Sequence, residues 1–304
     1  MRKAIITGAN GFLGSSVAKA LAESGCRVYA VIREDKEEFN ELLHDERITV
    51  VRCNMDHYRT LPEKIRDQAD VFFHFAWEGS AGPKRGDRAC QIHNLTWSCD
   101  AVEAAAHMKC SRFVFAGSIM EYEIETMMRT EQEPAPSMLY CAAKKSADYM
   151  CRTVANTLGL TYVCGLISNV YGPGERSPRL INTSIRKLLH GEHTAFSAGE
   201  QTYDFIYITD AARAFAAIGK SGRANKTYYI GSRSPRPLKE FLLELGEIAA
   251  PGVKLGLGEL PFNGVSLTYR EFDVDAVLSD CGVEPEVSFR EGITRTVEWI
   301  KQEG

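Results

Sequence analysis

The stretch that decides the fold is Thr7-Gly-Ala-Asn-Gly-Phe-Leu-Gly14, which follows the short apolar run Lys3-Ala-Ile-Ile-Thr7. Three glycines spaced three residues apart permit a tight turn between a strand and a helix and a close approach of the backbone to a phosphate. The N-terminus of the following helix offers free N–H groups and a positive dipole end to that phosphate. We therefore expect a dinucleotide to bind at Gly8, Asn10, Gly11, Phe12, Leu13 and Gly14.

Short apolar runs alternate with longer amphipathic stretches along the first half of the chain. Strands are predicted at residues 4–7, 27–32, 48–52, 71–75, 113–116 and 162–167, and helices at 14–24, 35–43, 61–68, 87–108 and 136–158. Nearly all-apolar strands that alternate with helices indicate an α/β fold, a doubly wound parallel sheet with helices on both faces. Ligands of such sheets bind at the carboxyl ends of the strands.

The pattern loosens after about residue 171, where a loop rich in glycine and proline begins. Helices are predicted there at residues 179–190, 209–219, 238–249 and 289–302, and strands at 205–208 and 228–230. We expect two parts, a dinucleotide-binding domain over residues 1–170 and a smaller α/β substrate-binding part over 171–304, interleaved with the first.

Composition and charge exclude several functions. The chain has 304 residues with 44% hydrophobic and 25% charged side chains, as in globular proteins. A net charge of −4 gives no general attraction to nucleic acid or to anionic membranes. The nine cysteines show no metal-ligand spacing, so we predict no metal site. No apolar run approaches the roughly 20 residues that span a bilayer, and no leader precedes the first strand, so a cytoplasmic location is expected.

Tyr140 and Lys144 lie one helical turn apart on the same face of a predicted helix. A nearby ammonium group and an oxidised nicotinamide would both lower the pKa of a tyrosine, which is normally about 10, and so suit it to proton transfer. The strand that ends at Ser118 supplies a hydroxyl ahead of this helix.

At this point the sequence resembles the extended short-chain dehydrogenase/reductases, a Rossmann-fold family, and specifically their nucleotide-sugar epimerase/dehydratase branch. The resemblance covers nearly the whole chain, and several motifs occur in the order found in that family. The matching stretches are residues 7–14, 75–77, Asn94, 115–122, 140–144, 169–173 and 199–210.

The resemblance implies roles for individual residues. Ser118 would hydrogen-bond the reacting oxygen, Tyr140 would be the acid or base, and Lys144 would bind the nicotinamide ribose. Asn94 corresponds to a supporting helix asparagine. Further positions of the motifs imply a cofactor site at Asn54, Met55, Phe75, Ala76 and Trp77, and a substrate site at Trp77, Ser118, Asn169, Arg179, Tyr203 and Arg270.

Arg33 favours NADP(H) over NAD(H). NAD-specific proteins place a carboxylate at the end of the second strand, where it binds the adenosine ribose hydroxyls. Ile32 occupies that position here, and the arginine that follows suits a 2′-phosphate. NAD(H) remains the alternative.

Residues after Ser118 narrow the reaction. Related dehydratases have a carboxylate in the two positions that Ile119 and Met120 occupy, so dehydration is disfavoured. Glu121 is interpreted as a surface or loop carboxylate. Many family members have an arginine where Tyr203 stands, and an aromatic residue there resembles the 4-keto sugar reductases.

Three functions follow from this interpretation. The first is an NADP(H)-dependent 4-keto nucleotide-sugar reductase, and the second is a nucleotide-sugar 4-epimerase that retains NAD. The third is a non-catalytic dinucleotide sensor, which the intact tyrosine and lysine argue against. The family resemblance also implies a homodimer in which the predicted helices at 87–108 and 136–158 pair with those of a second copy.

Overall fold

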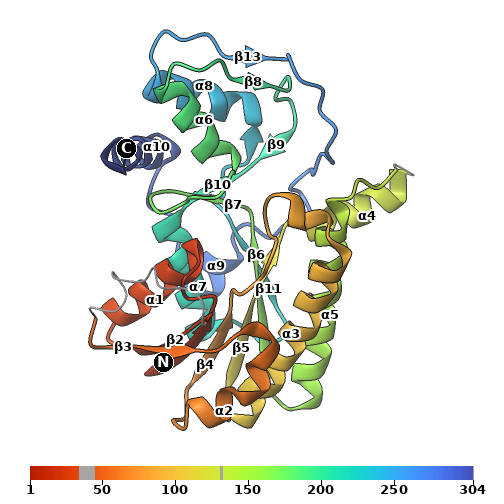
Figure 1. Ribbon diagram of the computed structural model, residues 1–304, viewed down its shortest axis with the longest axis vertical. Coiled ribbons are helices and arrows are strands. Elements are labelled where there is room, and N and C mark those ends of the chain that lie inside the picture. Colours follow the sequence, from red (N-terminus) through yellow and green to blue (C-terminus); the bar gives the residue numbers. More distant parts are fainter. Residues whose placement is uncertain (34–44, 131–132, 304) are drawn as a thin grey trace.

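We describe the protein from a computed structural model, which describes residues 1–33, 45–130 and 133–303. In these ranges the centre of the molecule is a parallel sheet with the strand order β11-β6-β5-β4-β1-β2-β3 (Figure 1). The strands are β1 (Lys3–Thr7), β2 (Arg27–Ile32), β3 (Ile48–Arg52), β4 (Val71–His74), β5 (Arg112–Ser118), β6 (Thr161–Ile167) and β11 (Thr227–Ile230). The strand order reverses between β1 and β4, which opens a crevice at their carboxyl ends. The predicted doubly wound α/β fold is confirmed.

Both faces of the sheet are buried because successive strand residues point to opposite sides. On β4, Phe73 packs into the cluster below α1 (Phe12–Glu23) and α7 (Ile208–Ser221). Its neighbour Phe72 packs into the other cluster, where its ring stacks on that of Phe113 with centroids 5.4 Å apart. This alternation explains why the strands are apolar throughout rather than at every second position.

Two pairs of helices cover these faces (Figure 1). Helices α1 and α7 pack together on one face, with α9 (Ala276–Cys281) beside α7. Helices α3 (Arg88–His107) and α5 (Met138–Thr157) pack against each other on the opposite face. The 3-10 helix η1 (Met55–Thr60) contacts α3, and the short α2 (Leu61–Lys64) follows it. Within the described ranges, every helix is too short or too polar to cross a lipid bilayer.

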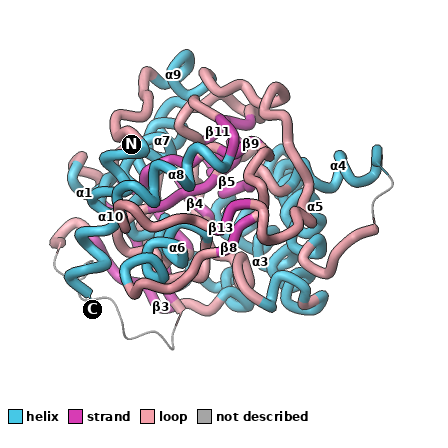
Figure 2. Tube along the Cα trace, turned by 90° about the horizontal axis from the view of Figure 1, so that it is seen from above, coloured by secondary structure: helices cyan, strands magenta, loops and turns pink. Residues whose placement is uncertain are grey.

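The C-terminal segments form a smaller group above the carboxyl ends of the strands (Figures 1 and 2). Its helices are α6 (Leu180–Leu189), α8 (Leu238–Ala249) and α10 (Phe289–Glu303). Its paired strands are β7 (Asn169–Tyr171) with β10 (Phe205–Tyr207), β8 (Ala195–Phe196) with β13 (Gly256–Leu257), and β9 (Thr202–Tyr203) with β12 (Arg236–Pro237). The rings of Phe205, Phe241 and Phe289 meet with centroids 4.7–5.7 Å apart and join β10, α8 and α10.

The structure differs from the sequence predictions in several elements. The predicted helix at 61–68 ends at Lys64, because the next residue, Ile65, adopts an extended conformation and its side chain enters the core. Helix α4 (Glu121–Thr130) and the short strands β7, β8, β9, β12 and β13 were not predicted. The predicted strand at 228–230 is part of β11 and extends the main sheet next to β6. The predicted helix at 35–43 lies outside the described residues.

Candidate active site

The glycine turn between β1 and α1 has the shape that close phosphate contact requires. Gly8 has φ +67°, and a Cβ on it would lie 2.7 Å from the backbone nitrogen of Ala76. A Cβ on Gly14 would lie 2.2 Å from the carbonyl oxygen of Gly8, so α1 can approach the turn only with glycine at this position. Gly11 caps α1 with exposed backbone. The helix N-terminus is therefore open to an anionic group, and the turn fits a dinucleotide pyrophosphate.

The adenosine end of such a cofactor would lie near the ends of β2 and β3. Asn54 precedes η1, and Met55, its first residue, is buried. Arg33 follows β2, and its charge contributes to lowering the pKa of Tyr58, a buried residue of η1 whose pKa is raised overall by burial. Arg33 thus lies close enough to η1 for its charge to act on Tyr58.

Ser118 and Tyr140 lie together at the carboxyl end of β5. Tyr140 is in the first turn of α5, and 6% of its surface is exposed. Burial raises the pKa of Tyr140, while a hydrogen bond with Ser118 and the positive charges of Arg179 and Arg85 lower it. A phenol held this way needs further stabilisation of its anion before it can act as a base near pH 7.

Lys144 lies one turn further along α5 and is fully enclosed. Its Nζ donates to the carbonyl oxygen of Ala116 at 2.9 Å and lies 3.8 Å from the Trp77 ring and 4.9 Å from the Phe115 ring. Burial lowers the pKa of Lys144 to about 8, and the charge of Glu121 opposes this change. Lys144 is thus directed at the space between β4 and β5.

Trp77 links the cofactor side of the crevice to Tyr140. Its Nε1 donates to Gln91 Oε1 at 3.0 Å, and its ring meets that of Tyr140 edge to face with centroids 6.1 Å apart. Phe75 and Ala76, which precede it, lie beside the turn at Gly8; the Phe75 nitrogen donates to the Thr7 carbonyl at 3.1 Å.

Glu121 is buried, so the prediction of a surface or loop carboxylate is wrong. It is the first residue of α4, 1% exposed, and its Oε1 accepts the Ser118 backbone N–H at 2.8 Å. Burial raises the pKa of Glu121 to about 7, and the charge of Asp148 adds to this rise. Helix α4 turns this side chain inward, and this helix was not predicted from the sequence.

Asn94 binds the backbone of Glu78, in the loop after β4, and makes no hydrogen bond to Ser118, Tyr140 or Lys144 among the described residues. Its Oδ1 accepts from the Glu78 nitrogen at 2.8 Å and its Nδ2 donates to the Glu78 oxygen, also at 2.8 Å. The Asn94 carbonyl in turn accepts from Ser98 Oγ, which lies 3.0 Å from His74 Nε2. Through Thr7, 2.8 Å from His74 Nδ1, this buried chain of hydrogen bonds reaches the glycine turn.

Burial lowers the pKa of His74 to about 3, so this ring is neutral. Because Ser98 donates to Asn94, its oxygen accepts from His74 Nε2, and His74 Nδ1 accepts from Thr7. The tautomer is assigned from these partners. This chain of hydrogen bonds fixes the position of the loop after β1 relative to the loop after β4.

The predicted substrate residues are divided between the two walls of the crevice. Asn169 Nδ2 donates to the Asp204 carbonyl at 3.1 Å, which ties β7 to the start of β10. Tyr203 lies on β9 and stacks on Phe205 with centroids 5.7 Å apart. Arg179 caps α6, and its charge acts on Tyr140. Arg270 is exposed on the segment between β13 and α9, and the described contacts do not join it to Tyr140.

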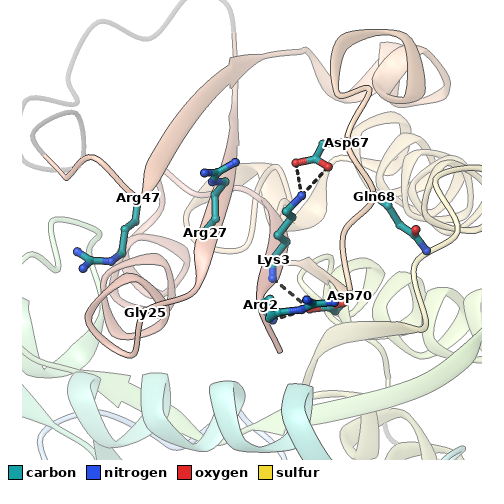
Figure 3. A pocket seen from close by; sticks show the side chains of 8 residues that line it. All are labelled: Arg2, Lys3, Gly25, Arg27, Arg47, Asp67, Gln68 and Asp70. Atoms are coloured by element: carbon teal, nitrogen blue, oxygen red, sulfur yellow. Dashed lines mark hydrogen bonds and ion pairs between the residues drawn. The ribbon is translucent and has the colours of Figure 1, made fainter.

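A large pocket lies away from this crevice. This open pocket of about 700 Å³ is lined by Arg2, Lys3, Gly25, Arg27, Arg47, Asp67, Gln68 and Asp70 (Figure 3). These residues belong to the amino ends of the strands, and Lys3 is neutralised by Asp67 at 2.6 Å. Among the residues that the structure describes, His, Cys, Asp and Glu form no group of three that could hold a metal ion.

The model of the NAD dependent epimerase/dehydratase family matches residues 4–231, three quarters of the chain. The chain belongs to this family. A relative within the family is dTDP-glucose 4,6-dehydratase of Streptomyces niveus, 25% identical over 317 residues, which cover 98% of this chain and 92% of that protein.

Two solved structures have the same fold. UDP-glucose 4-epimerase of Thermotoga maritima, in complex with UDP-glucose, is 22% identical and covers 99% of both chains with a TM-score of 0.81. UDP-glucuronic acid 4-epimerase of Bacillus cereus, in complex with UDP-glucuronic acid and NAD, is 23% identical, with a TM-score of 0.81 over 99% of this chain and 100% of that one.

In this member of the family, Arg85 is a charged residue of the site that sequence reasoning missed. It lies in the 3-10 helix η2 (Pro83–Gly86), and its guanidinium carbon is 4.7 Å from the centre of the Tyr140 ring. Its surroundings in sequence, Lys84 and Arg88, suggest an ordinary exposed basic loop. Only the packing of η2 against the start of α5 reveals where its side chain lies.

Proposed function

We propose that the protein is an NAD(P)-dependent oxidoreductase that transfers hydride at one carbon of a nucleotide sugar, with 4-keto reduction as its reaction. The observation that supports this most is the meeting of Ser118, Tyr140 and Lys144 at the end of β5, next to the apolar side chains of Ile119 and Met120. These groups supply one proton-transfer residue and its partners.

When bound, a nicotinamide would supply the hydride. Ser118 would donate a hydrogen bond to the substrate oxygen, and Tyr140 would give its phenolic proton to that oxygen as the carbonyl becomes an alcohol. Arg179 and Arg85 would stabilise the resulting phenolate, since both already lower the pKa of Tyr140. Lys144 would hold the nicotinamide ribose beside Trp77. Burial of the phenol excludes bulk water from this proton transfer.

For the cofactor we propose NADP(H). The glycine turn accommodates the pyrophosphate of either dinucleotide, so Arg33 makes the distinction. Its position after β2, close to η1, supports a contact with a 2′-phosphate. NAD(H) is the alternative, which the NAD found in the B. cereus epimerase favours.

Dehydration is not proposed, because Ile119 and Met120 occupy the two positions after Ser118 and neither side chain can carry a proton. Glu121 is occupied by the Ser118 N–H and is closed off from the crevice. Glu123 accepts from Cys141 Sγ at 3.6 Å instead. A Glu123→Gln variant is expected to keep reductase activity. Water elimination by the wild type that is lost in this variant would contradict our proposal.

The second candidate is 4-epimerisation of a nucleotide sugar with retained NAD, which needs the same three residues and is the reaction of both solved neighbours. The two reactions are separated by a panel of nucleotide sugars and their 4-keto derivatives incubated with NADPH or NADH. A fall in absorbance at about 340 nm with a 4-keto substrate supports reduction. Bound NAD that survives purification, with sugar inversion and no net oxidation, supports the epimerase.

A homodimer is also proposed. Apolar side chains on the outer faces of α3 and α5 are exposed, with Ile92 at 56%, Leu139 at 38%, Tyr149 at 60% and Met150 at 46%. Both helices pack on the same side of the molecule (Figure 1). A second copy that covered this face would bury these side chains.

A further inference from the structure

Arg85 occupies a constrained position at the mouth of the crevice. The helix η2 that holds it packs against the segment before α5, so that a Cβ on Gly86 would lie 3.1 Å from Pro136 Cβ. The guanidinium lies over the Tyr140 ring, with its central carbon 4.7 Å from the ring centre. Contact with an aromatic face favours a cation but satisfies none of its N–H donors.

The guanidinium of Arg85 hydrogen-bonds the Cys141 thiol and its charge acts on Glu123, but no carboxylate of the described residues forms an ion pair with it. Its Nε is shielded from solvent and has no hydrogen-bond partner among the described residues. The carboxylate of Glu123, on the facing helix α4, accepts from Cys141 rather than from Arg85. An enclosed N–H of a charged group without an acceptor is costly to a folded protein. An anionic ligand would remove this cost.

The side chains on which the charge of Arg85 acts show that it lies near both walls of the crevice. Its charge lowers the pKa of Tyr140, of Glu123 and of Tyr203, although burial raises each of these pKa values overall. Tyr203 belongs to the C-terminal wall of the crevice, whereas Tyr140 belongs to the sheet side. Arg85 therefore faces both walls, and Arg179 acts on Tyr140 from the C-terminal wall. Arg179 forms an ion pair with the buried Glu175, its Nε 3.6 Å from Oε2, whereas Arg85 has no such ion pair among the described residues.

We propose that Arg85 is an anion-binding residue of the substrate crevice, which recognises phosphate or carboxylate oxygens of the substrate beside Tyr140. This inference rests on the proposed nucleotide-sugar function and names a residue that determines substrate affinity. Its guanidinium offers parallel N–H donors, which match two oxygens of one phosphate or carboxylate.

Two parts of a nucleotide sugar have this chemistry: the diphosphate and, in uronic acids, the sugar carboxylate. The test measures dissociation constants by calorimetry in the presence of saturating NADPH. The ligands are UDP, dTDP, CDP, GDP, UDP-glucose and UDP-glucuronic acid. The proteins are the wild type, Arg85→Gln, Arg85→Lys and the control Arg88→Gln, which removes an exposed arginine from the start of α3.

We expect Arg85→Gln to weaken binding about 10- to 100-fold, as loss of a charge-assisted hydrogen bond does. Arg85→Lys, which keeps the charge without the paired donors, should recover part of this loss, and Arg88→Gln should bind like the wild type. Weaker binding of the nucleoside diphosphates and of both nucleotide sugars assigns Arg85 to the diphosphate. Weaker binding of UDP-glucuronic acid alone assigns it to the carboxylate.

Unchanged dissociation constants in Arg85→Gln for every ligand that the wild type binds would overturn this role and leave the proposed function intact. A wild-type protein that binds NADPH but none of the six ligands would overturn both proposals. Melting temperatures of the variants separate a binding defect from misfolding. If Arg85→Gln does not fold, the Arg85→Lys variant gives the test. Dissociation constants equal to those of the wild type for every ligand would then overturn the anion-binding role of Arg85, because only arginine offers paired donors.

Discussion

The backbone N–H of Ser118 donates a 2.8 Å hydrogen bond to Oε1 of Glu121, a carboxylate that is 1% exposed. This bond fixes the turn between β5 and α4, and Ser118 Oγ in addition accepts from the Met120 nitrogen at 3.3 Å. The hydroxyl predicted to contact substrate is therefore positioned by a group that lies behind it. A carboxylate in this position also places a titratable charge close enough to Tyr140 and Lys144 to act on both.

Replacing Glu121 by Gln tests this charge while it keeps an acceptor for the Ser118 N–H. The groups that interact with Glu121 are Lys144, Lys145 and Asp148 on α5, together with Tyr122, Tyr140 and Cys164. Because the negative charge of Glu121 raises the pKa of Tyr140 and of Lys144, its removal lowers both.

In the direction of alcohol oxidation Tyr140 must be deprotonated, so activity rises with pH. The Glu121→Gln variant should therefore show the rising limb of kcat/KM at lower pH than the wild type. The difference should disappear well below pH 7, where Glu121, with a pKa of about 7, is protonated in the wild type. The matched control is Glu125→Gln, an exposed carboxylate on the same helix. A pH profile identical to that of the wild type would show that Glu121 is only structural.

Replacing Tyr140 by Phe removes the proton donor and should lower kcat by about 10²- to 10⁴-fold, the usual contribution of a positioned acid or base. NADPH binding, measured by fluorescence titration, should remain within about threefold of the wild type, because the glycine turn is untouched. Tyr149→Phe is the control, since Tyr149 lies on the same helix with its side chain exposed. Full activity in Tyr140→Phe would rule out this residue as the acid, whereas a wild type that binds the cofactor but converts no substrate would favour the dinucleotide-sensor alternative.

Replacing Arg33 by Gln should weaken NADPH binding about 10- to 100-fold and change NADH binding little, because only NADPH has a 2′-phosphate for the guanidinium. Dissociation constants of the two cofactors should be measured at two ionic strengths, since a charge contact weakens with salt. The control is Arg47→Gln, at the opposite end of the sheet. Equal effects on the two cofactors would favour NAD(H) and with it the epimerase.

Introducing charge on the outer face of α5 should prevent dimer formation. Tyr149→Glu combined with Met150→Glu would force two carboxylates into an otherwise apolar contact, which costs more than the contact returns. Sedimentation equilibrium is expected to give a dimer for the wild type and a monomer for the variant. Leu243→Glu changes an equally exposed side chain on α8 and should remain dimeric. A monomeric wild type would contradict the proposed assembly.

The sequence was sufficient where local chemistry alone determines structure. The glycines after β1 follow from the steric limits of one turn, and apolar strands between amphipathic helices indicate a parallel sheet covered on both faces. Tyr140 and Lys144 share a face because they are one helical turn apart. These patterns need no knowledge of distant parts of the chain, and the fold and family that they predicted are confirmed.

Only the tertiary structure decided the burial and the surroundings of residues that are covered by distant segments of the chain. Glu121 in sequence is an ordinary carboxylate, and only the packing of α4 against β5 and α5 buries it. Arg85 belongs to a basic, glycine-rich loop and becomes part of the site because η2 packs against the segment before α5. The spacing of apolar residues predicts on which side of its own helix or strand a residue lies. Its burial and charge environment depend on neighbours that are far apart in sequence. The sequence alone therefore predicted the pair Tyr140 and Lys144, and the folded chain determined the charges that surround it.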